Sequence, residues 1–111
     1  MRFKTLIFIC LSFSLLFALS PYNEGYRQYI RYVKHIPHYG IKAPMLLKKL
    51  NVKNEDDLKA LFQNNAELLI KNTAKFNPEA SKGLEKIIKK GKITSLEAFL
   101  TGIVNGKIPP G

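Results

Sequence analysis

The sequence predicts an all-α protein, a small bundle of four to six short helices that follows an N-terminal signal peptide. Apolar residues recur at three- and four-residue steps in several segments, which is typical of helices with one buried side. Asparagine, serine and threonine precede these segments, and glycine or asparagine follows them, as at helix ends. Because 111 residues suit one domain, we expect a signal peptide over 1–20 and a single helical domain over 21–111 with an extended C-terminal tail.

The N-terminal segment has the three parts of a secretory signal. Arg2 and Lys4 precede an uncharged and almost wholly apolar run, and small residues at Ala18 and Ser20 suit a signal peptidase. The run of about fifteen residues is shorter than the roughly 17 to 25 that a spanning helix needs. The sequence therefore predicts a periplasmic or secreted protein. Pro21 directly after the cut leaves a membrane-tethered, uncleaved form as the alternative.

Cysteine content and charge limit the possible chemistry. The single cysteine, Cys10, lies in the signal segment, so the exported chain would have none. This excludes internal disulfides, thiolate metal sites, covalent haem attachment and cysteine nucleophiles in the exported form. The formal charge of +10 arises from 18 basic and 8 acidic residues, and loss of Arg2 and Lys4 leaves 16 against 8, or +8. This excess predicts anionic partners.

The segment 23–35 predicts an amphipathic helix. Its apolar members keep helical spacing and three basic residues fall on another side: Tyr26, Tyr29, Ile30 and Val33 against Arg27, Arg31 and Lys34. Aromatic residues interleaved with arginines are also typical of single-stranded nucleic acid binding. We favour Tyr26 and Tyr29 as core residues whose hydroxyls reach water, and a nucleic acid partner is the less favoured reading.

Two histidines mark the end of this helix. His35 and His38 bracket Pro37, where a turn begins. Two imidazoles three residues apart indicate an alternative function, a small ligand or metal carrier that uses His35 and His38. A metal site with two protein donors is usually incomplete, and we expect no cofactor.

The middle of the chain predicts a short helix and then a longer one. The short helix follows Gly40 and stops at Asn51, which suits a left-handed cap. The longer helix, 54–75, starts at Asn54 before three acidic residues, where the helix dipole favours negative charge. Asn64-Asn65 interrupts its pattern in the form of a second N-cap, so we expect a kink or, preferably, two abutting helices.

The next helix carries the most basic patch of the chain. Asn77 before Pro78 predicts its start and Gly91 its end. Its lysines crowd one element: Lys82, Lys86, Lys89, Lys90 and Lys92. With the arginines of the first helix, such a patch could bind anionic lipid headgroups or an acidic partner, since a lysine near a charged membrane contributes on the order of 1 kcal/mol.

The last helix is expected to start at a capping box, Thr94-Ser95-Leu96-Glu97, and to end at Gly106. The tail that follows contains Pro109-Pro110, which cannot continue a helix. We therefore expect an extended C-terminal segment that Ile108 anchors to the helical domain.

Several short motifs spread over the chain resemble a group of small exported bacterial all-helical proteins of uncharacterised function: Gly25-Tyr26-x-x-Tyr29, Gly40-Ile41, Leu61-Phe62-x-Asn64-Asn65, Ile70 and Ile108-Pro109-Pro110. This resemblance implies a helical fold and no catalytic residues. The stretch 106–110 is similar to the region near the methionine ligand of small c-type cytochromes. Ile108 stands where methionine would, and the haem-attaching cysteines are absent, so no haem is implied.

These observations predict a function at the surface. No nucleophile, base or metal constellation stands out, so we expect no enzyme. We expect an exported, basic helical protein that acts as a binding or accessory module for an acidic partner or the anionic membrane surface. The residues expected to bind are Arg27, Arg31, Lys34, Lys82, Lys86, Lys89, Lys90 and Lys92.

Overall fold

A computed structural model describes residues 20–107 of the chain. The predicted signal segment before Ser20, with Cys10, and the predicted tail over 108–111 lie outside the described residues. Over 20–107 the protein is all-α, as expected, and its elements are α2 (Pro21–Tyr29), the π-helical turn η1 (Ile30–Lys34), α3 (Ala43–Lys49), α4 (Glu55–Phe76), α5 (Pro78–Lys89) and α6 (Ile93–Val104). In this part of the chain, no helix combines the length and hydropathy needed to cross a membrane.

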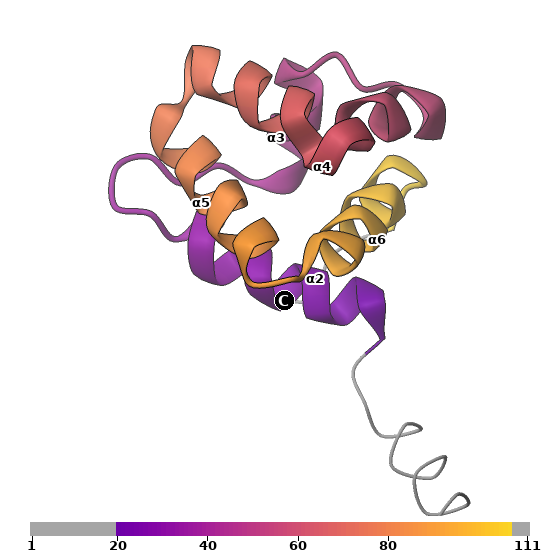
Figure 1. The fold of residues 1–111 in the computed structure, drawn as a ribbon, viewed down its shortest axis with the longest axis horizontal. Helices are drawn as coiled ribbons and strands as arrows, with labels where there is room; N and C mark the ends of the chain where they lie inside the picture. Colours follow the sequence, from indigo (N-terminus) through magenta and orange to yellow (C-terminus); the bar gives the residue numbers. More distant parts are fainter. Residues whose placement is uncertain (1–19, 108–111) are drawn as a thin grey trace, which may run out of the picture.

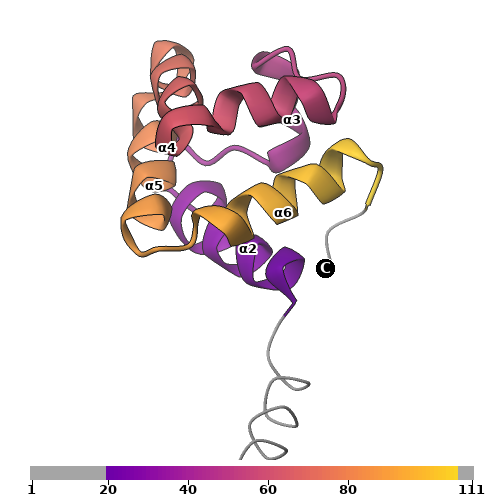
Figure 2. The same cartoon turned by 45° about the vertical axis from the view of Figure 1, so that its right-hand side comes forward.

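The helices pack in two neighbouring groups. α2 lies beside α6 in both views and makes the most extensive contact between two elements, and α5 packs on α4 and on η1 (Figures 1 and 2). Gly25 allows α2 to approach α6 closely, because a β-carbon there would overlap with the carbonyl oxygen of Ser95 and lie 2.7 Å from the β-carbon of Phe99. Among residues 20–107, every buried hydrophobic residue of the core lies between residues 29 and 100, so a form comprising residues 20–111 contains this core.

The centre of the α2–α6 contact is aromatic. The rings of Tyr22, Tyr26 and Tyr29 surround Phe99 with centroid distances of 5.4, 5.7 and 5.4 Å. Tyr29 is 1% exposed, which confirms it as a core residue. The expectation that its hydroxyl reaches water is wrong, because the buried hydroxyl donates to the carbonyl of Ile41 at 2.7 Å.

Most predicted helix ends are confirmed. The side chain of Asn54 accepts from the amide of Asp57 at 2.9 Å, and left-handed residues follow three helices: Asn51 (φ 59°), Gly91 (φ 79°) and Gly106 (φ 90°). The first helix begins earlier than expected, at Pro21, because the Ser20 hydroxyl accepts from Asn23 at 3.2 Å.

The predicted capping box at the start of α6 is wrong. α6 begins at Ile93, and its N-cap residue, Lys92, makes no side-chain capping bond. The amide of Lys92 donates to Ile87 at 3.2 Å, and its carbonyl accepts from Leu96 at 2.9 Å. The tight turn after α5 therefore leads directly into the first turn of α6, before Thr94 is reached.

The predicted interruption of the long helix is confirmed at residues 63–66. Asn64, Asn65 and Ala66 have φ of 53°, 59° and 63°, so α4 consists of two helical segments joined by a left-handed run. Asparagine tolerates this conformation better than other residues with a side chain. Asn64 does not act as the expected N-cap, since an N-cap residue is extended and Asn64 is left-handed.

Candidate binding surface

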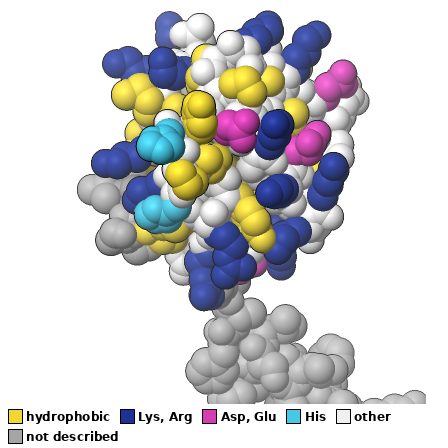
Figure 3. Space-filling view, turned by 90° about the vertical axis from the view of Figure 1, so that its left-hand side faces the viewer, with side chains coloured by type: hydrophobic (Ala, Val, Ile, Leu, Met, Phe, Trp, Pro, Cys, Tyr) yellow, Lys and Arg dark blue, Asp and Glu magenta, His cyan; other side chains and the backbone are white. Residues whose placement is uncertain are grey.

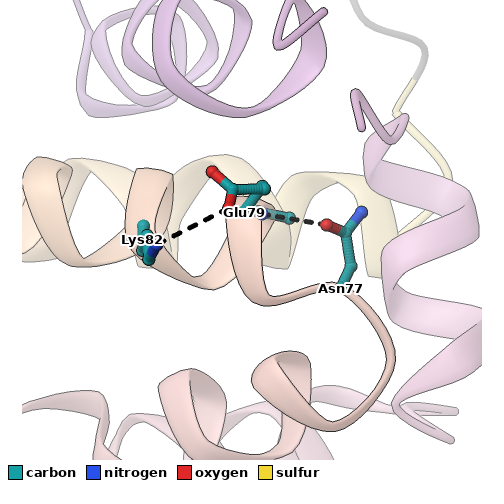
Figure 4. Close-up of polar contacts among 4 residues, drawn as sticks. Asn77, Glu79 and Lys82 are labelled. Atoms are coloured by element: carbon teal, nitrogen blue, oxygen red, sulfur yellow. Dashed lines mark hydrogen bonds and ion pairs between the residues drawn. The ribbon is translucent and has the colours of Figure 1, made fainter. Parts of the chain in front are cut away.

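The start of α5 is fixed by Asn77. Its side-chain oxygen accepts from the amide of Ala80 at 3.0 Å, and Pro78 occupies the first turn (Figure 4). One turn later Lys82 forms an exposed ion pair with Glu79 at 3.5 Å. Exposed pairs of this kind contribute little to stability. The pair nevertheless balances the charge of Lys82, which therefore adds less to the basic surface than its neighbours.

One side of α5 faces η1. Gly83 allows this contact, because a β-carbon there would overlap with the carbonyl oxygen of Tyr32. In a helix of 3.6 residues per turn, Lys86 and Lys90 lie near the side of Gly83, three and seven residues after it. The predicted lysine patch is therefore directed in part toward the predicted arginines of the first helix.

The two basic segments meet at Tyr32. The ammonium nitrogen of Lys90 lies 4.9 Å from the centroid of the Tyr32 ring. Hydrogen bonding from Lys90, and more weakly from Arg31, lowers the pKa of the half-buried Tyr32, while burial opposes this shift. Arg31, Tyr32 and Lys90 thus form one group, which we call the Tyr32 cluster. Lys86 lies on the same side of α5, and Arg27 is exposed one helical turn before Arg31.

Two of the lysines predicted to bind a partner, Lys92 and Lys89, lie away from the Tyr32 cluster. Lys92 pairs with Glu24 at 3.3 Å and so joins the start of α6 to α2. Hydrogen bonding from Gln28 and then from Lys92 lowers the pKa of the Glu24 carboxyl. Lys89 lines a hollow of about 490 Å³ between α5 and the break in α4, on the other side of α5.

The two histidines lie on an ordered turn over residues 35–40. The amides of Tyr39 and Gly40 both donate to the carbonyl of Ile36, at 3.2 and 2.9 Å, and His38 is left-handed with φ of 66°. Both histidines are exposed on one face (Figure 3). Over residues 20–107 there is no group of three or more His, Cys, Asp or Glu side chains that could hold a metal ion. The carrier function stays a prediction.

Four residues near the basic surface were not among the residues predicted to bind a partner: Tyr32, Tyr39, Phe76 and Asn77. Tyr39 is 54% exposed and Phe76 is 36% exposed. The side-chain amide of Asn77 donates to the carbonyl of Tyr39 at 2.9 Å. Tyr32 falls outside the apolar spacing of its helix, and it belongs to the run of tyrosines interleaved with arginines, directly after Arg31.

Comparisons with protein-family models, with curated proteins and with solved structures give no match to this chain. The resemblance to small exported helical proteins therefore stays a prediction. Any assignment of function depends on the geometry and charge of the surface described above.

Proposed function

We propose that the protein is a binding or accessory module whose basic surface docks onto an anionic partner outside the cytosol. One observation carries this proposal. Two segments far apart in sequence, η1 and the end of α5, bring Arg31 and Lys90 to the side chain of one tyrosine, Tyr32. Two like charges beside the same side chain repel one another, so a nearby anion would relieve the repulsion as well as bind.

The surroundings of the Tyr32 cluster favour anion binding. Arg27 and Lys86 extend the positive charge along α2 and α5, and both are exposed. The ion pairs over residues 20–107, Lys82 with Glu79 and Lys92 with Glu24, do not involve Arg31 or Lys90. Positive charge of this kind attracts acidic polypeptides and anionic headgroups by the same long-range field.

Binding of the 20–111 form to anionic probes tests the proposal. The probes are poly-glutamate and vesicles that contain phosphatidylglycerol, each at low and moderate salt. We expect salt-sensitive retention by at least one probe, with affinity on the order of tenfold lower in the Arg31→Gln, Lys90→Gln double variant. Absence of salt-sensitive retention by both probes would remove the proposal.

A matched control separates local charge from total charge. Lys53→Gln with Lys59→Gln removes the same two charges from exposed positions just before α4 and in its first half. This variant should keep nearly all of the binding. An equal loss in both double variants would mean that only net charge matters and that the Tyr32 cluster has no special part.

A second candidate function, a metal or small-ligand carrier, is favoured by one observation only. His35 and His38 are both exposed on the short turn 35–40, so both imidazoles are accessible. Titration of Zn²⁺ and Cu²⁺ into the protein and its His35→Ala variant tests this function. Equal affinity of the two proteins would exclude a role for His35.

A further inference from the structure

We infer that Tyr39 and Phe76 form a membrane-docking site, in which two aromatic side chains enter the headgroup region of an anionic bilayer while neighbouring basic residues bind its phosphates. We call these two residues the aromatic pair. The inference rests on the proposed function, and it assigns the basic surface to a lipid partner rather than an acidic polypeptide.

The aromatic pair is exposed although the fold buries other rings well. Large exposed hydrophobic side chains over residues 20–107 are Tyr39, Met45, Leu68 and Phe76, and Tyr39 is the most exposed of them at 54%. By contrast, Phe99 is 1% exposed. A tyrosine or phenylalanine ring has an apolar body that is stable at the level of lipid headgroups, where tyrosine also keeps its hydroxyl in water.

The structure holds the aromatic pair in one place. Asn77, next to Phe76, donates to the carbonyl of Tyr39 at 2.9 Å. The turn before Tyr39 is closed by two backbone hydrogen bonds to Ile36. Both rings are therefore presented by backbone that is already ordered, so little conformational entropy is lost when they bind.

Positive charge surrounds the aromatic pair. The ammonium nitrogen of Lys49 lies 5.7 Å from the centroid of the Phe76 ring, and Lys75 is exposed directly before it. Lys34, whose carbonyl lies against Gly40, connects this region to Arg31 one turn earlier. Figure 3 shows the histidines beside a hydrophobic patch, with lysine and arginine side chains on several sides of it.

The shape of this region favours a bilayer. The turn 35–40 lies at the outer edge of the fold, at the left of Figure 1. An acidic polypeptide would bind the charges but would also need a matching apolar surface to cover the two rings. A bilayer supplies both contacts, because its interface accepts apolar side chains and its anionic headgroups bind the surrounding lysines.

Single tryptophans test insertion directly, because the chain contains no tryptophan. The variants are Tyr39→Trp and Phe76→Trp, with Ala60→Trp as a control at an exposed position in the first half of α4. Each is mixed, in the 20–111 form, with vesicles of phosphatidylcholine and phosphatidylglycerol in equal parts. We expect a blue shift of emission and quenching by lipids brominated in the acyl chain for Tyr39→Trp and Phe76→Trp, and neither effect for Ala60→Trp.

A second variant keeps the test independent of the tryptophan substitutions. Tyr39→Ser with Phe76→Ser should lower vesicle partitioning on the order of tenfold, because binding of this kind depends on buried apolar area as well as charge. The same variant should bind poly-glutamate as well as the unchanged protein does. Circular dichroism should show the same helix content in the serine double variant and in the unchanged protein.

The outcomes separate this inference from the proposed function. Vesicle binding without a tryptophan shift, or without loss in the serine variant, would overturn the docking site and leave charge-based binding intact. Salt-sensitive binding to poly-glutamate alone would also overturn it and would identify an acidic polypeptide as the partner class. Absence of binding to either probe would remove the proposed function itself.

Discussion

The side-chain amide of Asn77 donates a hydrogen bond of 2.9 Å to the backbone carbonyl of Tyr39 and so joins the turn 35–40 to the junction of α4 and α5. The side-chain oxygen of Asn77 accepts from the amide of Ala80 at 3.0 Å and so caps α5. One residue thus both starts the lysine-bearing helix and positions the turn that carries the exposed tyrosine.

Two substitutions at Asn77 should separate these roles. Asn77→Asp keeps an oxygen for the cap but loses the donor to Tyr39, whereas Asn77→Ala loses both bonds. We expect Asn77→Ala to lower the free energy of unfolding by about 1 to 2 kcal/mol and Asn77→Asp to lower it less, since a carboxylate suits a helix start. Urea denaturation measures both. Equal losses would show that the cap contributes little.

Gly83 should be intolerant of alanine. In most helices a Gly→Ala change is favourable by up to about 1 kcal/mol. At residue 83 the added β-carbon would overlap with the carbonyl of Tyr32, so α5 must move away from η1. We expect Gly83→Ala to cost about 1 to 3 kcal/mol in thermal or urea unfolding and to weaken anion binding at the Tyr32 cluster. Lys89→Ala, at an exposed position on the other side of α5, is the stability control, and a stabilised Gly83→Ala protein would contradict the close contact.

The α4–α5 interface contains one satisfied and one unsatisfied hydroxyl. Ser81 donates to the carbonyl of Ile70 at 2.7 Å, whereas the hydroxyl of the fully buried Thr73 has no partner among residues 20–107. We expect Thr73→Val to be neutral or stabilising by up to about 1 kcal/mol, and Ser81→Ala to be destabilising by about 1 kcal/mol. Denaturant midpoints of the two variants give the comparison. A large loss for Thr73→Val would mean that a partner, such as a buried water, binds that hydroxyl.

Burial raises the pKa of Tyr29 above its ordinary value of about 10, and the neutral hydroxyl donates to Ile41. The stability that comes from the neutral form is therefore complete below about pH 10 and is lost as pH rises toward the folded-state pKa. Tyr29→Phe should be less stable than the unchanged protein at neutral pH by about 1 to 3 kcal/mol, because the Ile41 carbonyl loses its donor. The free energies of unfolding of the Tyr29→Phe variant and the unchanged protein should converge above pH 10. A difference that does not change with pH would contradict this assignment.

The helix ends and the core positions could largely be predicted from the sequence, because each depends on residues a few positions apart. Asn54 and Asn77 are recognisable as caps from their immediate neighbours. The candidate binding surface could be predicted only as a list of basic residues. Its geometry depends on contacts between distant segments, such as Lys90 with Tyr32, and Asn77 with Tyr39 across 38 residues, for which the sequence carries no local signal.

The break in α4 offers a last test, because the ordinary order of helix preference should be inverted there. Asn65 is exposed and left-handed, with φ of 59°. Glycine adopts this conformation without steric cost, whereas alanine loses about 1 kcal/mol in it. We therefore expect Asn65→Gly to be at least as stable as the unchanged protein and Asn65→Ala to be less stable by about 1 kcal/mol in urea denaturation. At Lys59, in the regular first segment of α4, the alanine variant should instead be more stable than the glycine variant by a similar free energy of unfolding. If alanine were also the better residue at 65, α4 would have to be continuous through that position, and the two segments would not be separated by a left-handed run.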